Sequence, residues 1–170
     1  MEIERKFLIK KLPENLETYP HHHITQAYLC TEPVIRIRQK DSKYILTYKS
    51  AGLLSREEIE MPLTKDSFDH LLKKADGMII EKERYCIPLE NELTIELDIF
   101  ERDLKGLILA EIEFRDEETA LAYEMEDWFS KDVTMDSAYH NSTMSKGNIP
   151  PFKFTMLPRK PGYRFASAYR

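Results

Sequence analysis

Short segments in which apolar and charged residues alternate with a period of two run along most of this 170-residue chain. The pattern is typical of β-strands, because successive side chains of a strand point to opposite faces. It predicts strands over residues 2–9, 23–30, 34–40, 43–50, 56–61, 78–88, 92–101 and 107–115. Two-residue polar links at 41–42 and 90–91 suit tight hairpins between consecutive strands. We therefore expect a mainly antiparallel sheet of eight strands.

Helices are few in this pattern. Thr64 begins one with capping chemistry, and the helix should run to about Lys74 before Gly77 ends it. A second helix is predicted from Glu117 to about Phe129. Antiparallel strands with a few flanking helices define an α+β protein, and closing the eight strands on themselves would make a β-barrel.

One face of nearly every predicted strand carries fully charged side chains two residues apart. A solvated sheet face gives this spacing too, but it normally mixes in Thr, Ser and Gln. Here the signs also segregate by strand, so inward-facing charges in a closed barrel would line a tunnel with an acidic part and a basic part. The positions are Glu2, Glu4, Lys6, Arg36, Arg38, Lys49, Arg56, Glu58, Glu60, Lys82, Arg84, Glu96, Asp98, Glu111 and Glu113.

This division of charge has a chemical meaning. Sets of carboxylates suit hard cations such as Mg²⁺ or Mn²⁺. Several Arg and Lys side chains in one cavity suit a compact polyanion, for which a phosphate chain is the natural candidate. A metal beside a polyphosphate is the arrangement that phosphoryl transfer requires.

Composition narrows the partners and the compartment. The net charge of −5 argues against general binding to nucleic acid or anionic membranes. No apolar run approaches the ~18 residues of a membrane span, and the charged start argues against export. Cys30 and Cys86 suit reduced core thiols, so we expect a cytoplasmic protein. The run His21–His23 is interpreted as a surface loop rather than a metal site, since consecutive side chains diverge.

The last 25 residues differ from the rest. Residues 146–170 contain six basic groups, no acid and four prolines, without periodicity. We expect a domain over residues 1–145 and an irregular basic tail over 146–170. One hypothesis is that the tail caps a mouth of the tunnel and adds Lys or Arg to phosphate binding.

The ordered charge pairs resemble the CYTH domain, the triphosphate tunnel metalloenzymes. The start Glu2-Ile3-Glu4-Arg5-Lys6 matches the Glu-x-Glu-x-Lys signature of that family. The later segments 35–38, 46–49, 56–60, 81–85, 96–100 and 110–114 follow in the family's order, and Asp132-Val133-Thr134 with Tyr139 and Asn141 resembles its closing segment. The resemblance covers roughly residues 1–145.

The resemblance implies an eight-stranded triphosphate tunnel that uses a divalent metal. It implies that Glu4 and Lys6 take part in catalysis, Lys6 by binding or orienting the attacking water. Phosphate-binding residues would be Lys6, Arg36, Arg38, Lys49, Arg56, Lys82 and Arg84. Metal ligands would be Glu2, Glu4, Glu111 and Glu113, supported by Glu60 and Asp98, with Glu58 and Glu96 as additional lining. Relatives often carry arginine where this chain has Ala138, which would loosen contact with the outer phosphate or with the plug at the tunnel mouth.

Within the family, the compact body looks most like the small bacterial inorganic tripolyphosphatases. We therefore expect hydrolysis of tripolyphosphate to pyrophosphate and phosphate with Mg²⁺ or Mn²⁺, and a small triphosphate as the partner. Thiamine triphosphatase and class IV-type adenylyl cyclase remain alternatives, with Tyr28, Tyr48 or Trp128 as aromatic candidates for thiamine. A non-catalytic polyphosphate-binding module and a purely structural β-domain are further alternatives. The oligomeric state, monomer or homodimer, stays open.

Overall fold

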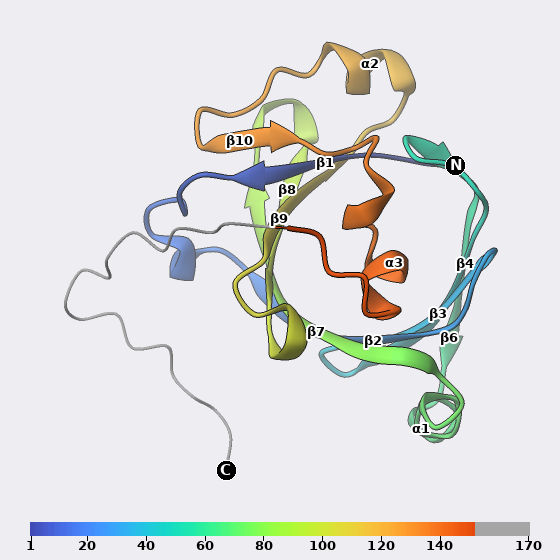
Figure 1. The fold of residues 1–170 in the computed structure, drawn as a ribbon. Coiled ribbons are helices and arrows are strands. Elements are labelled where there is room, and N and C mark those ends of the chain that lie inside the picture. The colour runs from blue at the N-terminus through green and yellow to red at the C-terminus, as the bar shows by residue number, and fades with distance from the viewer. Residues whose placement is uncertain (152–170) are drawn as a thin grey trace.

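The computed structural model describes residues 1–151, where ten strands form one antiparallel sheet (Figure 1). The strands are β1 (Glu2–Ile9), β2 (His21–Thr31), β3 (Val34–Lys40), β4 (Lys43–Lys49), β5 (Ser55–Arg56), β6 (Glu58–Leu63), β7 (Asp76–Pro88), β8 (Thr94–Phe100), β9 (Ile108–Glu113) and β10 (Phe129–Asp132). The helices are α1 (Lys65–Leu72), α2 (Glu117–Ala122) and α3 (Asn141–Ser145), and the 3-10 turns are η1 (Leu16–Thr18), η2 (Glu90–Glu92), η3 (Arg102–Leu104) and η4 (Ser137–Tyr139). No helix in this range has the length and apolarity needed to cross a membrane.

The sheet curls into a nearly closed barrel. Neighbouring strands follow the order β10-β1-β9-β8-β7-β2-β3-β4-β6. The two-residue strand β5 pairs with β1, and β6, which follows β5 after one residue, pairs with β4. The β5–β6 segment therefore links the two ends of the sheet (Figure 1). This architecture confirms the predicted α+β barrel, with the predicted fifth strand divided into β5 and β6.

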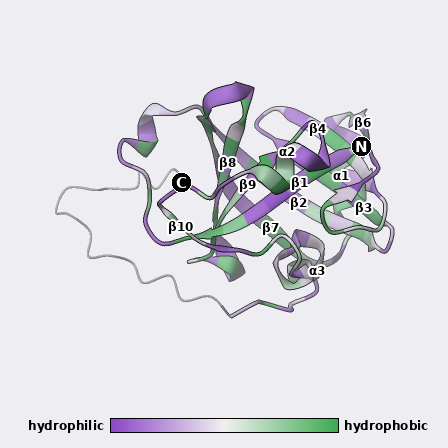
Figure 2. Cartoon of the chain, turned by 90° about the horizontal axis from the view of Figure 1, so that it is seen from above, coloured by the Kyte–Doolittle hydropathy of each residue, from purple (hydrophilic) through white to green (hydrophobic). Residues whose placement is uncertain are grey.

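Side chains alternate between the inside and the outside of the barrel, so hydrophilic and hydrophobic colours intermix along its strands (Figure 2). Toward one end, the inward positions change from charged to apolar. Ile80, Phe100 and Leu109 each stand two residues from a charged inward position and cluster with Tyr139 of η4 and Met144 of α3. These residues and α3 fill one end of the barrel, while the charged positions are left around its middle.

Two further apolar clusters cover the outside of the sheet. Phe7 and Leu97 belong to one of them, which α2 and the segment leading to β10 cover. Ile37 and Phe68 belong to the other, which lies under α1. Thr64 caps α1 as predicted, since its side chain accepts a hydrogen bond from the Ser67 amide. Because apolar side chains of the strands pack outward under these covers, their charged neighbours are directed inward.

The predicted helix from Glu117 to Phe129 is too long. The helix α2 ends at Ala122, and Phe129 begins the strand β10. The guanidinium of Arg5 donates hydrogen bonds of 2.7 Å to the carbonyls of Ala120 and Tyr123, which satisfies the end of the helix. Phe129 stacks on Phe7 with ring centroids 4.7 Å apart, so the chain continues along β1 as a strand.

Two local predictions are also wrong. The run His21–His23 is not a loop, because β2 begins at His21. Gly77 does not end α1, which stops at Leu72; it lies inside β7 with φ of 72°. A Cβ there would lie 2.2 Å from the backbone oxygen of Ser145, so Gly77 allows α3 to approach β7.

The remaining expectations concern the thiols and the tail. Cys30 and Cys86 are free and partly buried. The predicted tail boundary at residue 146 falls directly after α3, and residues 152–170 of the tail lie outside the described residues. The division into a domain and a tail stays a prediction.

Candidate active site

The middle of the barrel encloses a cavity of about 250 Å³ whose walls are mostly charged. Each of the strands β1 to β9 contributes at least one residue to its lining, so the cavity exists only because the sheet closes. Every predicted site residue except Asp98 lines it. These residues are Glu2, Glu4, Lys6, Arg36, Arg38, Lys49, Arg56, Glu58, Glu60, Lys82, Arg84, Glu96, Glu111 and Glu113.

The acidic wall is built by the pairing of β1 with β9. The register places Glu4 opposite Glu113 and Lys6 opposite Glu111. Burial, followed by the nearby Glu111 carboxylate, raises the pKa of Glu4 to about 7. Burial and the carboxylates of Glu2 and Glu96 raise the pKa of Glu113, which lies at the exposed rim. Burial and neighbouring carboxylates thus disfavour the charged forms of both Glu4 and Glu113, and a divalent cation bound to them would offset that penalty.

Lys6 lies within this acidic wall. Its Nζ is 3.1 Å from Glu111 Oε1 and 3.9 Å from Glu4 Oε1, and it donates a 3.4 Å hydrogen bond to the Tyr139 carbonyl. Burial alone would lower the pKa of Lys6, but Glu111 and Glu4 outweigh burial and raise it. Lys6 therefore stays protonated between the two carboxylates.

Glu2 lies at the junction of the acidic and basic walls. Lys49 Nζ donates to its Oε1 at 2.7 Å, and Arg56 Nε donates to its Oε2 at 3.2 Å. Lys49 Nζ also lies 3.1 Å from Glu58 Oε2. Burial would raise the pKa of Glu2, but Lys49, the hydrogen bond with Glu58 and Arg56 lower it to about 2. Glu2 is therefore a fixed negative charge in the metal-free protein.

Asp98 lies behind the cavity wall with no solvent exposure. Its oxygens accept hydrogen bonds of 2.6 and 2.7 Å from Arg84 Nε and Nη2, and Lys82 Nζ lies 2.6 Å from Oδ2. Arg84 also contacts Glu111 at 3.0 Å and forms an ion pair with Glu96. Burial lowers the pKa of Lys82 to about 8, although Asp98 opposes the shift. This geometry makes Asp98 a counter-ion that supports two lining bases, and its predicted metal role stays a prediction.

The basic wall contains two guanidinium groups without a carboxylate partner in residues 1–151. Arg36 Nη2 donates to Thr47 Oγ1 at 3.1 Å, while its buried Nε has no hydrogen-bond partner within the described chain. Arg38 donates two hydrogen bonds, of 3.0 and 2.9 Å, to Gln26 Oε1. Burial, together with Arg36 and Arg84, lowers the pKa of Arg38 to about 10. A buried donor without an acceptor is costly, so this wall is suited to an anion with several oxygens.

Several cavity residues were not predicted as site residues. Lys40, His140, Asn141 and Ser142 also line the cavity, the last three because α3 and the residue before it enter the barrel (Figure 1). Burial, then Lys6 and Arg56, lowers the pKa of His140 to about 4, so its imidazole is neutral at pH 7. Only Asn141 carried a sequence signal, through the resemblance of the closing segment. Ala138 packs against the inner apolar cluster and does not line the cavity.

A nearly closed antiparallel barrel with an acidic and a basic wall around a central cavity defines a tunnel barrel for a charged ligand. The model of the CYTH domain family matches residues 1–135. An inorganic triphosphatase of Nitrosomonas europaea is 37% identical over 148 residues, which cover 85% of this chain and 96% of that protein. An inorganic triphosphatase of Acetivibrio thermocellus is 32% identical over 159 residues, covering 89% of this chain and 97% of that protein. The chain belongs to the CYTH domain family.

Solved structures support the same assignment. A crystal structure of an inorganic triphosphatase superposes with a TM-score of 0.65 at 33% identity and covers 86% of this chain and 95% of its own. A protein from Hippeastrum, described as a putative adenylyl cyclase with a dominant triphosphatase activity, matches at a TM-score of 0.54 and 17% identity. It covers 71% of this chain and 83% of its own, and at this identity it supports the fold alone. The triphosphate tunnel fold that the sequence predicted is confirmed.

Proposed function

We propose that this protein is a divalent-metal-dependent hydrolase that cleaves inorganic tripolyphosphate to pyrophosphate and phosphate. The observation that carries the proposal is the cavity lining, in which basic side chains face carboxylates around the middle of the barrel. The two relatives described as inorganic triphosphatases support it. The free thiols of Cys30 and Cys86 fit a cytoplasmic location.

The three aromatic residues considered for thiamine binding are either almost completely buried or lie outside the cavity. Tyr28 lines the cavity but is only 3% exposed, and its hydroxyl accepts a hydrogen bond from Gln26. Trp128 packs edge-on against Phe129 in an outer cluster, and Tyr48 alternates with the inward Lys49. Within residues 1–151, none of these three residues presents an open aromatic face to the cavity, so this part of the lining favours a substrate made of phosphate alone.

The carboxylates fit a hard cation such as Mg²⁺ or Mn²⁺. Glu4 and Glu113 would hold it, with Glu2, Glu60 and Glu111 nearby, because oxygen ligands suit these ions. When bound, the cation would polarise a phosphoryl oxygen and favour deprotonation of water. We propose that the guanidinium groups of Arg36 and Arg38, which have no carboxylate partner within residues 1–151, bind phosphate oxygens, together with Lys49, Arg56, Lys82 and Arg84.

Lys6 would orient the attacking water. Its Nζ lies between two carboxylates of the metal side, 3.1 Å from Glu111 and 3.9 Å from Glu4, and its raised pKa keeps it protonated as a donor. Glu4, whose pKa is about 7, would balance that charge near the reacting phosphate. Replacing Lys6 should therefore lower kcat more than it raises KM.

The decisive experiment compares tripolyphosphate, thiamine triphosphate and ATP with Mg²⁺ or Mn²⁺, and identifies the products. We expect phosphate and pyrophosphate from tripolyphosphate at the highest kcat/KM. Glu4→Gln and Glu113→Gln should each lose at least about 100-fold, while Glu118→Gln on exposed α2 should not. Cyclic AMP would identify a cyclase, and binding of tripolyphosphate without turnover would identify a binding module; either result refutes the proposal.

A further inference from the structure

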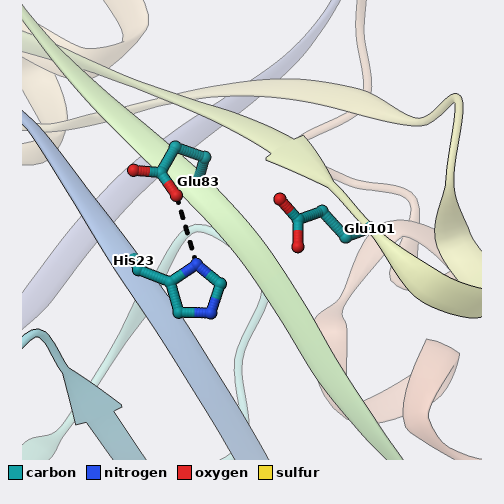
Figure 3. A group of neighbouring side chains, drawn as sticks. All are labelled: His23, Glu83 and Glu101. Atoms are coloured by element: carbon teal, nitrogen blue, oxygen red, sulfur yellow. Dashed lines mark hydrogen bonds and ion pairs between the residues drawn. The ribbon is translucent and has the colours of Figure 1, made fainter. Parts of the chain in front are cut away.

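A cluster of histidine and glutamate side chains lies on the outer surface of the barrel, away from the tunnel. His23 on β2, Glu83 on β7 and Glu101 just after β8 each offer one ligand atom, and these atoms all lie within 4.8 Å of one another (Figure 3). All three side chains are partly exposed, so an ion can enter from solvent. None of them lines the central cavity.

The backbone fixes this cluster. His23 and Glu83 are directly paired in the register of β2 with β7, and His23 Nδ1 lies 3.2 Å from Glu83 Oε2. The Glu101 amide donates a 2.9 Å hydrogen bond to the Glu81 carbonyl, which holds the end of β8 beside β7. In Figure 3 the carboxylate of Glu101 faces the His23–Glu83 pair. Two adjacent strands and the residue that directly follows a third strand thus bring the ligands together.

A fourth donor stands on the same strand face. His21 is two residues before His23, and its Nε2 lies 3.8 Å from Glu83 Oε1. The ring of His21 rests against Tyr85 with centroids 5.2 Å apart, which limits its rotation. The intervening residue, His22, points elsewhere and contacts Asp41 at 2.6 Å.

The negative charge of the cluster favours binding of a cation. Over residues 1–151, neither Glu83 nor Glu101 forms an ion pair with a lysine or arginine, unlike Glu81, which pairs with Arg102 at 2.6 Å. Two carboxylates held this close together repel each other, and a divalent ion bound between them removes that repulsion.

The donor chemistry selects the kind of ion. Two ligands bound at 2.0–2.1 Å to a tetrahedral ion lie roughly 3.3 Å apart, close to the 3.2 Å between His23 and Glu83. Imidazole nitrogens with carboxylate oxygens suit Zn²⁺ and similar transition ions, whereas Mg²⁺ prefers oxygen ligands only. We propose that His21, His23, Glu83 and Glu101 form a second metal site, selective for zinc-like ions, that ties β2, β7 and the end of β8 together outside the tunnel.

The test uses the full chain, stripped of metal and then held in excess Mg²⁺ so that the tunnel carboxylates have a hard cation. Zn²⁺ is titrated by calorimetry, and the imidazole NMR signals of the five histidines are followed in parallel. We expect one equivalent of Zn²⁺ and shifts at His21 and His23. A hundredfold excess over Kd should raise Tm by about 5–10 °C, because the unfolded chain lacks the assembled ligands.

Variants separate this site from the tunnel. Glu83→Gln and His23→Asn should each weaken Zn²⁺ binding at least 10-fold, so the test survives if one variant fails to fold. His22→Ala, next to the cluster on the same strand, should bind as the wild type does. The proposal is overturned if no Zn²⁺ binds, if both cluster variants bind normally, or if His140 alone shifts, which would place the ion in the tunnel. None of these results depends on triphosphate hydrolysis. The zinc site can therefore be refuted while the proposed function stands, and the reverse.

Discussion

Asp98→Asn tests whether this residue is a metal ligand or a buried counter-ion. The substitution keeps the size of the side chain but removes the charge that lies 2.6 Å from Lys82 Nζ and 2.6 and 2.7 Å from two nitrogens of Arg84. Since the carboxylate is fully buried, water cannot replace it. Breaking a buried ion pair from one side costs about 3–5 kcal/mol.

The structure places the loss near the lower end of that range. The pKa of Lys82 is already about 8, so losing its proton at pH 7 costs only about 1.4 kcal/mol. Lys82 would therefore become neutral in the variant. Arg84 cannot lose its proton, but it keeps Glu111 at 3.0 Å and the ion pair with Glu96. We expect Asp98→Asn to lower the free energy of unfolding by about 3 kcal/mol at pH 7.

The measurement is urea unfolding of the metal-free protein. At pH 9.5 the penalty should shrink by about 1.4 kcal/mol, because Lys82 is then neutral in the wild type as well. Adding Lys82→Met to Asp98→Asn should recover part of the loss, since it removes the unpaired amine. Glu96→Gln is the control, because its side chain is 38% exposed and should cost less than about 1 kcal/mol.

Two results would refute this reasoning. One is a change below about 1 kcal/mol in the metal-free Asp98→Asn protein, together with a large loss of metal affinity, which would make Asp98 a ligand as the family resemblance implied. The other is an Asp98→Asn, Lys82→Met double variant that is no more stable than Asp98→Asn alone. That result would mean that the unpaired Lys82 amine is not the source of the lost stability.

Three further predictions concern groups around the tunnel. Gln26→Leu removes both hydrogen bonds that orient Arg38, so KM for tripolyphosphate should rise about 10-fold with a smaller change in kcat. Because the pKa of Lys82 is about 8, the affinity for tripolyphosphate should fall as the pH rises through 8. Lys82→Arg should flatten that pH dependence. If the pH dependence of binding is the same in the variant, Lys82 is not the titrating group. In urea unfolding, Gly77→Ala should lower the free energy of unfolding by about 1–3 kcal/mol more than Gly147→Ala does. Both glycines have positive φ, but of the two only Gly77 would place a Cβ against backbone atoms. Equal losses in the two variants would contradict this clash.

The sequence predicted the lining well because the information is local. A strand period of two decides which residues share a face, and the tight link at Asp41 and Ser42 fixes β3 against β4 without reference to the rest of the chain. Apolar partners such as Phe7 and Leu97 then show which face is covered on the outside. The long-range pairings of β1 with β9 and with β5 then bring these faces together around one cavity.

What the sequence could not show depends on contacts between distant segments. The role of Asp98 depends on Lys82 and Arg84 reaching it from the neighbouring strand, whereas its spacing from Glu96 matches that of a ligand pair. Gln26 has no local signature, and its importance emerges only when Arg38 is seen to rest on it. The end of α2 is set by Arg5, more than a hundred residues away along the chain.

In the tunnel, a metal ion and a phosphate compete with the same ion pairs between the protein's own side chains. Lys49 Nζ donates a 2.7 Å hydrogen bond to Glu2 Oε1. This contact must break before the ammonium group can bind phosphate or the carboxylate can bind the metal. Lys49→Met should therefore strengthen binding of Mn²⁺ alone and weaken binding of tripolyphosphate in EDTA, each by about 10-fold, since a charge-assisted hydrogen bond contributes about 1.5–3 kcal/mol. Lys65→Met, which breaks an exposed pair with Asp69 on α1, is the control and should change neither constant. If both constants moved in the same direction in Lys49→Met, the pair with Glu2 would not be what links the two ligands. If they move apart, a metal that captures Glu2 releases Lys49 for phosphate, and each ligand prepares the tunnel for the other.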